Sequence, residues 1–349
     1  MPSLGTIPFS VLDVANVPEG SEVGAALRNT VALAKHTEAL GYRRFWVAEH
    51  HNMPGIASSA PGVLIAHIAD ATASIRVGSG GVMLPNHAPL VVAEQFGMLE
   101  ALHPGRVDLG IGRAPGTDPV TAHALRRSAD PLSAEDFPQQ LGELLGFFSG
   151  RFPADHPYHR ITAVPGLGDQ PAIWLLGSSD FSAQLAGWLG LPFAFAHHFS
   201  ARNTMPALAA YRASFRPSDT LDRPYAMVAV AVICADTDEH AEWLAGSSRL
   251  SFVRLRTGMP GRLPSPEEAA AHVYSTTEQL VLGTRSAGQV VGGPARVRHE
   301  LARLIEETGA DELMVTTAVF SHEERMRSYE LVAGIAQIRP LAEDPAGVP

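Results

Sequence analysis

The sequence predicts an α/β protein that folds as a (β/α)8 barrel with insertions at the C-terminal mouth. Short runs rich in Val and Ile recur along the chain, and amphipathic segments alternate with them. Continuous apolar runs are typical of parallel strands that are buried on both faces. Eight such runs can be counted, and eight strand–helix units favour a closed barrel over an open, doubly wound sheet.

The expected strands share an apolar centre of several residues, and most are followed by a turn or by the start of a helix. We place them at residues 7–13, 44–51, 74–84, 106–112, 172–177, 192–198, 225–235 and 311–317. The last of these runs, DELMVTT, supplies the eighth strand and completes the count.

The expected helices share apolar residues at helical spacing. We place them at residues 24–40, 61–73, 89–102, 134–148, 179–189, 202–215, 294–308 and 323–338. Their ends carry the expected signals: Gly41 stops the first helix, and Pro61 suits the first turn of the second.

No shift in composition marks a linker, so we expect a single domain over residues 1–349. The stretch 151–170 is rich in Pro and Gly and should be irregular. The stretch 247–293 is too long for a plain connection. We therefore expect an insertion at the barrel mouth there, where functional lids are found.

Composition excludes several classes of function. The chain has 26 basic and 36 acidic residues and a net charge of −10, which argues against nucleic acid as a partner. No apolar run is long enough to span a membrane, and the N-terminal segment does not resemble a signal peptide. A single cysteine, Cys234, excludes an intrachain disulfide framework and fits a reducing compartment. We therefore expect a cytoplasmic enzyme or binding protein.

Catalytic residues of a barrel lie at the C-terminal ends of its strands. The candidates at these ends are Asp13, Glu49-His50-His51, Gly80-Gly81, Pro85-Asn86-His87, Arg113, Gly177-Ser178-Ser179 and His197-His198. Because neighbouring strand residues point to opposite faces, we expect one histidine of each adjacent pair to face the mouth. The chain has neither an HxH motif after the first strand nor an HExxH motif, so we expect no metal site.

Two features indicate an anion-binding site. The run LLGSSDFSAQLA places Gly177, Ser178 and Ser179 at a helix start, where free N–H groups and the helix dipole favour anions. Plain capping of the helix by Ser178 or Ser179 is the alternative. Arg113 follows the neighbouring strand and offers a guanidinium suited to phosphate. A second Gly-rich helix start, VVGGPARVRHEL, we interpret as structural.

The pair Gly80-Gly81 interrupts an apolar strand. Glycine within a strand indicates a bulge or the close approach of a ligand to the backbone. Close packing of a neighbouring helix is an equally good explanation.

Five segments extend the pattern from the first strand to the eighth. They read FSVLDVANV, FWVAEHHN, VGSGGVMLPNHAPLVVAEQFGMLEALHPGRVDLGIGRAPG, IWLLGSSDFSAQLAGWLGLPFAFAHHFS and VVGGPARVRHELARLIEETGADELMVTT. In this order they resemble the bacterial luciferase-like superfamily of flavin-dependent monooxygenases. The block from Val77 to Gly116 is the most specific part of the resemblance.

The resemblance implies a barrel that binds reduced FMN, supplied by a separate NAD(P)H:flavin reductase, and uses O2 to oxygenate an organic substrate. Homodimers are also implied. Some similar actinobacterial enzymes tailor aromatic or polyketide natural products, which suggests such a substrate. Luciferases proper carry a reactive Cys before the phosphate-site Arg, whereas this chain has Gly112 there, so light emission gains no support.

The resemblance also implies roles for particular residues. His50 matches the active-site histidine beside the flavin, with an acid/base role, and Glu49 should lie near the ring. The Gly80-Gly81 bond matches a non-prolyl cis peptide beneath the flavin. The phosphate positions are matched by Arg113, Gly177, Ser178, Ser179 and Ser182.

Three alternatives remain open. A deazaflavin-dependent oxidoreductase of the same superfamily would transfer hydride without oxygen, but the long anionic tail of that cofactor suits a more basic entrance than a chain of net charge −10 offers. A non-catalytic flavin-binding relative would not require both His50 and Glu49. A metal-dependent barrel hydrolase would require ligand motifs that this sequence lacks.

Overall fold

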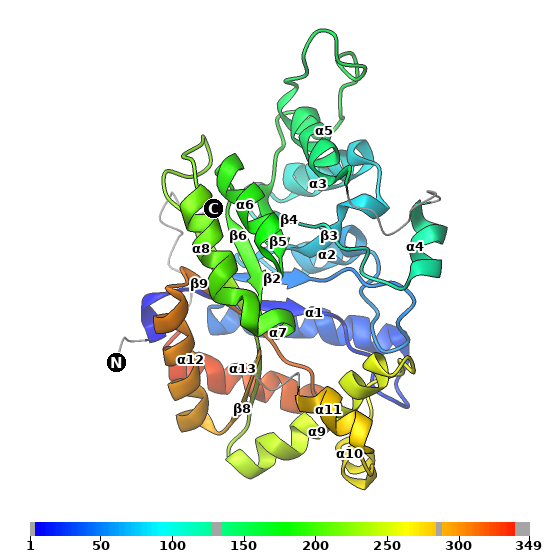
Figure 1. Cartoon of the computed structure of the whole chain (residues 1–349), viewed down its shortest axis with the longest axis vertical. Coiled ribbons are helices and arrows are strands. Elements are labelled where there is room, and N and C mark those ends of the chain that lie inside the picture. The colour runs from blue at the N-terminus through cyan, green and yellow to red at the C-terminus, as the bar shows by residue number, and fades with distance from the viewer. Residues whose placement is uncertain (1–3, 127–134, 284–287, 339–349) are drawn as a thin grey trace.

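The computed structural model of this chain describes residues 4–126, 135–283 and 288–338. Eight parallel strands close into a barrel in the order β1-β2-β3-β4-β5-β6-β7-β9, with β9 paired back to β1. Helices cover the outside of the barrel (Figure 1). The strands are β1 (Phe9–Asp13), β2 (Arg44–Val47), β3 (Arg76–Met83), β4 (Val107–Gly112), β5 (Ala172–Gly177), β6 (Phe193–Ala196), β7 (Ala226–Cys234), β8 (Gln289–Gly292) and β9 (Glu312–Thr316).

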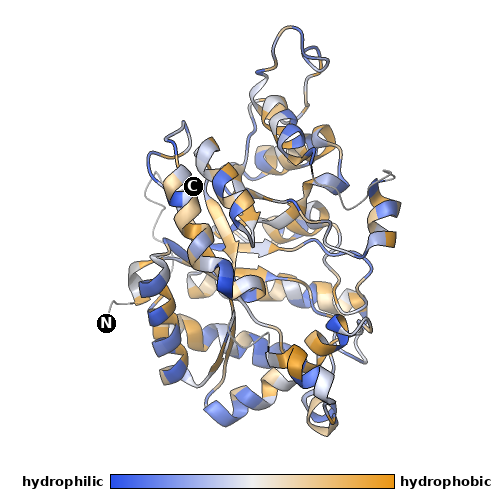
Figure 2. Ribbon diagram, viewed as in Figure 1, coloured by the Kyte–Doolittle hydropathy of each residue, from blue (hydrophilic) through white to orange (hydrophobic). Residues whose placement is uncertain are grey.

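The helices alternate with the strands, as the periodicity predicts. They are α1 (Val23–Leu40), α2 (Pro61–Ala71), α3 (Pro89–Leu102), α4 (Pro119–Arg126), α5 (Phe137–Ser149), α6 (Asp180–Leu189), α7 (His197–Ser200), α8 (Thr204–Ser214), α9 (Asp238–Arg256), α10 (Pro266–Ala271), α11 (Thr276–Gly283), α12 (Pro294–Thr308) and α13 (His322–Ala336). Figure 2 shows hydrophobic and hydrophilic residues mixed along these helices, as expected when one side packs on the barrel.

The predicted (β/α)8 barrel is confirmed, and all eight predicted strands are present. Of the helices and strands given above, six were not predicted: the helices α4, α7, α9, α10 and α11, and the strand β8. The additional strand, β8, is not part of the closed barrel and pairs with the second half of β7. The predicted insertion at 247–293 begins inside α9, because that helix continues to Arg256. Residues 284–287 of this stretch lie outside the described part of the chain.

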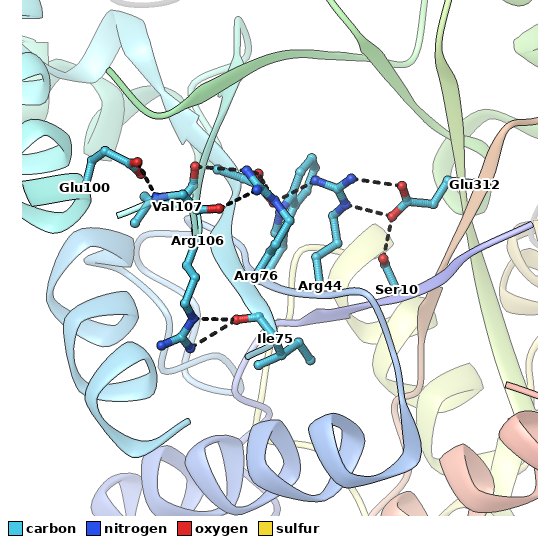
Figure 3. A network of polar contacts seen from close by, with 11 residues as sticks. Ser10, Arg44, Ile75, Arg76, Glu100, Arg106, Val107 and Glu312 are labelled. Carbon is cyan, nitrogen blue, oxygen red and sulfur yellow. Dashed lines mark hydrogen bonds and ion pairs between the residues drawn. The ribbon is translucent and has the colours of Figure 1, made fainter. Parts of the chain in front are cut away.

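A charged layer lies inside the barrel at the N-terminal ends of its strands, and Figure 3 shows Arg44, Glu312 and Ser10 in its network of polar contacts. Arg44, the first residue of β2, lies between two carboxylates that are also fully buried. Its Nη1 donates to Asp108 Oδ2 at 2.9 Å, and its Nε donates to Glu312 Oε1 at 2.8 Å. Arg76 and the Trp46 indole N–H also donate to Asp108. Every buried charge of this cluster is therefore paired.

The charges in this layer hold one another in their ionised forms. Burial alone would lower the pKa of Arg44, but Glu312 and Asp108 raise it overall. Burial would likewise raise the pKa of Asp108, but Arg44 and Arg76 lower it overall. Ser10 and Tyr225 donate hydrogen bonds to Glu312 and satisfy its remaining acceptor positions.

An apolar layer lies next to the charged layer, on the side of the C-terminal ends of the strands. Its side chains come from alternate positions of several strands and include Leu12, Trp46, Trp174, Met227 and Met314. The rings of Trp46 and Trp174 meet edge to face, with their centroids 5.3 Å apart. Because this layer closes the barrel below, the open space inside lies at the C-terminal ends of the strands.

No helix in residues 4–126, 135–283 and 288–338 combines the length and the hydropathy needed to cross a lipid bilayer.

We expect Arg44→Met to lower the free energy of unfolding by about 3–5 kcal/mol, because it leaves Asp108 and Glu312 buried without their counter-charge. Urea unfolding followed by circular dichroism measures the effect. The control is Arg303→Met on α12, whose guanidinium is exposed and pairs with Glu300 and Glu307. Arg303→Met should lower the free energy of unfolding by less than about 1 kcal/mol. Equal losses in the two variants would contradict the role given to Arg44.

Candidate active site

A cavity of about 440 Å³ opens at the C-terminal ends of the barrel strands. Its volume lies in the range typical of small-molecule sites. Seven of the nine site residues predicted from the sequence line it: His50, Gly80, Arg113, Gly177, Ser178, Ser179 and Ser182. Glu49 and Gly81 are not among the lining residues.

Anion-binding groups gather on one wall, where β4 and β5 lie side by side. Arg113 follows β4, and Ser179 is the N-cap residue of α6. The Ser179 side chain makes no capping hydrogen bond to the helix, so the alternative of plain capping is not what the structure shows. The Ser182 side chain, one turn further, is buried against the same wall. This wall therefore presents a guanidinium, three hydroxyls and a helix N-terminus to one space.

His50 lies at the cavity wall with an unsatisfied nitrogen. Its Nδ1 atom is buried and has no hydrogen-bond partner, while its backbone N–H donates to the Ser58 carbonyl at 3.0 Å. Burial lowers the pKa of His50, although the nearby Glu49 works in the opposite direction. The imidazole is therefore neutral near pH 7 and free to exchange a proton or a hydrogen bond with a bound molecule.

Glu49 follows the end of β2 at Val47, next to His50, and its side chain does not line the cavity. Its fully buried carboxylate accepts hydrogen bonds from His51, His87, Asn86 and the Met83 N–H. Burial alone would raise the pKa of Glu49, but the hydrogen bonds from the histidines and Met83 lower it to about 2. Glu49 is thus an ionised anchor that joins the segments after β2 and β3.

The Gly80-Gly81 peptide bond is cis, and the β3–β4 register shifts between Gly80 and Val82. A Cβ atom on Gly80 would lie 2.6 Å from a Leu12 methyl, and one on Gly81 would lie 2.3 Å from a Leu176 methyl. These contacts come from β1 and β5, which are other strands of the barrel, so packing of a helix does not explain the pair. The structure shows a bulged strand whose bare backbone at Gly80 borders the cavity.

The first pair of adjacent histidines divides as expected, although both residues follow the end of β2 at Val47. His50 faces the cavity and His51 faces Glu49. In the second pair His198 lines the cavity, but both residues belong to the short helix α7 and not to a strand. Each Nδ1 of that pair is engaged, His197 with the Thr204 hydroxyl and His198 with the Ala229 carbonyl.

Two other sequence candidates have structural roles. Asp13 is buried and forms an ion pair with Arg325 at 3.1 Å and accepts a hydrogen bond from Thr30, so it ties α1 and α13 to the barrel. At the Gly-rich start of α12, the Asp238 carboxylate accepts the Gly293 N–H at 2.6 Å. A protein carboxylate already occupies that helix start, as the structural interpretation expects.

Sequence reasoning missed several residues of the site. Phe181 does not line the cavity but contacts Arg113, which does, with the Arg113 Cζ atom 4.4 Å from the ring centroid. The mouth also carries an apolar rim formed by Met53, Ile56, Phe199, Phe252, Leu255 and Leu263. The last three fall in the stretch 247–293, where the sequence predicts an insertion at the mouth. No local pattern marks Met53, Ile56 and Phe199.

Comparison with known proteins supports the resemblance. The sequence model of the family described as luciferase-like monooxygenase matches residues 7–312. An Escherichia coli (strain K12) protein named luciferase-like monooxygenase is 47% identical over 95% of this chain and 98% of its own length. The N-acetyl-S-alkylcysteine monooxygenase of Bacillus subtilis (strain 168) is 36% identical over 94% of this chain and 97% of its own.

Solved structures agree. The crystal structure of apo-MsnO8 matches with a TM-score of 0.88 at 38% identity, covering 96% of this chain and 100% of its own. The oxygenating constituent of 3,6-diketocamphane monooxygenase from Pseudomonas putida, in complex with FMN, matches with a TM-score of 0.72 at 20% identity, covering 96% and 100% of the two chains. An F420-dependent secondary alcohol dehydrogenase has a TM-score of 0.68 at 14% identity, covering 96% and 99%. The last two show a shared fold alone.

The family match covers most of the chain, and the E. coli relative aligns over nearly the full length of both proteins. The chain therefore belongs to the luciferase-like monooxygenase family.

Proposed function

We propose that this protein is a flavin-dependent monooxygenase that takes reduced FMN from a separate flavin reductase and oxygenates an apolar organic substrate with O2. The observation that carries this proposal is the meeting of Arg113 and the start of α6 in the cavity that also holds His50 and Gly80. When bound, reduced FMN supplies the two electrons that reduce O2, with one oxygen atom going to the substrate and one to water.

The residues of the cavity fit such a cofactor. A phosphate would be held by the Arg113 guanidinium, by the Ser178 and Ser179 hydroxyls and by the free N–H groups at the start of α6. A flat ring system would lie where Gly80 leaves the backbone bare. His50 contributes the unpaired Nδ1 atom.

His50 is the residue that we propose handles protons. A neutral imidazole with a buried, unpaired nitrogen can donate a hydrogen bond to, or accept a proton from, a group that reacts beside it. Glu49 does not touch the cavity. As a positioning residue it fixes the backbone from which His50 projects, through its bonds to the segment after β3.

The substrate would lie on the apolar side of the cavity. Met53, Phe199 and Phe252 line this side, and Phe199 is 71% exposed although it is a large apolar residue. Of the described lining residues, Arg113 alone carries a permanent charge, and we assign it to the phosphate. An uncharged aromatic or alkyl group therefore suits the remaining space best.

Backbone hydrogen bonds hold part of this rim in place. Leu263 pairs with Val17 and Glu19 through bonds of 3.0 and 2.9 Å, and the Val17 N–H donates to the Gly55 carbonyl at 2.9 Å. Three loops from distant parts of the sequence are thus joined above the barrel. A rim fixed in this way would keep bulk water from the reacting groups.

We also propose a homodimer, formed through α2 and α3. These helices pack side by side and expose Val63, Val91, Met98 and Leu102, which are 76%, 44%, 52% and 67% accessible. Large apolar side chains that gather on one surface indicate an interface.

Anaerobic titration tests the cofactor. Reduced FMN should bind more tightly than reduced riboflavin. Arg113→Ala should weaken the affinity for FMN by at least about tenfold, because a charge-assisted phosphate contact is lost, and should change the affinity for riboflavin little. After mixing with O2, bound FMN should reoxidise more slowly than free FMN. Tight binding of a deazaflavin together with no binding of reduced FMN would favour the hydride-transfer alternative.

We expect His50→Ala to bind reduced FMN within a few-fold of wild type and to lose substrate oxygenation, measured as product formed per FMN oxidised. Because burial lowers the pKa of His50, its neutral form persists as the pH falls through 6.5. Wild-type oxygenation that depends on this form should therefore decline only below that pH. The control is His240→Ala on α9, outside the cavity. Full oxygenation by His50→Ala would remove His50 from the mechanism.

For the dimer, we expect Val63→Asp and Leu102→Asp to shift the protein towards monomer in sedimentation velocity runs, because each places a charge in the proposed contact. Val273→Asp is the control, since Val273 is 90% exposed and lies outside α2 and α3. A wild-type protein that sediments as a monomer at micromolar concentration would contradict the proposal.

A further inference from the structure

Phe181 is the second residue of α6, the helix whose N-terminus faces the cavity. Its ring is 41% exposed. The Arg113 Cζ atom lies 4.4 Å from the ring centroid, within the distance of a cation–π contact. Arg113 follows β4, and Phe181 belongs to the helix that follows β5, the neighbouring strand.

This contact leaves the guanidinium available to an anion. A guanidinium donates hydrogen bonds from its edges, in its own plane, whereas an aromatic ring interacts with a cation through the ring face. A carboxylate in place of Phe181 would instead compete with a phosphate for the same N–H groups. In the described ranges, no ion pair or hydrogen bond is recorded for the Arg113 side chain besides this ring contact.

The contact also reduces the freedom of a long side chain. An unsupported Arg must lose rotamer freedom when it binds an anion, which weakens binding. A guanidinium held against Phe181 has lost part of that freedom beforehand. Because Phe181 and the N-cap residue Ser179 belong to the same helix start, the ring holds Arg113 beside the N–H groups that would bind the same phosphate.

We propose that Phe181 is a positioning residue that sets the affinity for the FMN phosphate by holding Arg113 in place. This inference rests on the proposed function, in which Arg113 contacts that phosphate. It predicts that substitution of Phe181 changes the affinity for FMN, which carries the phosphate, and not the affinity for riboflavin, which lacks it. A purely structural Phe181 would affect FMN and riboflavin alike.

The test compares Kd values of reduced FMN and reduced riboflavin, measured anaerobically by flavin fluorescence. We expect Phe181→Ala and Phe181→Leu to raise the Kd of FMN about three- to tenfold, because both remove the ring face. The Kd of riboflavin should stay within about twofold of the wild-type value. Phe181→Tyr should bind both as wild type does, because it keeps the ring. Trp188→Ala is the matched control, since Trp188 is a 54% exposed aromatic on the same helix.

A double-mutant cycle completes the test. In an Arg113→Ala background, Phe181→Ala should have no further effect on FMN, because the ring then has no guanidinium to hold. The inference is overturned by equal weakening of FMN and riboflavin, by Phe181→Leu binding FMN as wild type does, or by a full Phe181→Ala effect without Arg113. If wild type fails to prefer FMN over riboflavin and Arg113→Ala changes nothing, the proposed phosphate site itself is wrong.

Discussion

The fold depends on one buried arginine. Arg44 bridges Asp108 of β4 and Glu312 of β9 across the lowest layer of the barrel. A buried charge is tolerated only when its partners are in place, so this bridge fits a single alignment of the strands that carry it. A shift of one residue in β2 would turn Arg44 out of the barrel and leave both carboxylates unpaired.

The same alternation carries upward to the site. Between Arg44 and His50, every second side chain points into the barrel. This places Trp46 in the apolar layer and His50 at the cavity. Glu49, one position away, points outward and is neutralised by a separate set of donors. The register fixed by the buried charges is thus the one in which His50 faces the cavity and Glu49 does not.

The parts of the molecule that the sequence predicts well are those coded locally. Apolar runs buried on both faces read as strands. That Arg113 and the Gly177–Ser179 turn line one cavity could be predicted, because both lie at the C-terminal ends of neighbouring strands. The parts that it does not predict depend on contacts across the chain. The partners of the Glu49 carboxylate were not predicted, because His51, His87 and Asn86 meet it only in the folded chain. The strand β8 has four residues, and its pairing with β7 gives no local signal.

The acidity of the chain does not conflict with a phosphate ligand. A net charge of −10 is spread over the whole surface, and at physiological ionic strength its field decays over about 8 Å. The contacts at the cavity are shorter than this and directed. Asp238 accepts an N–H at the start of α12, whereas the start of α6 has a serine N-cap without a side-chain capping bond and an arginine held on a ring. Local donors therefore decide where an anion binds, and the aromatic support of Arg113 preserves them without adding a competing carboxylate.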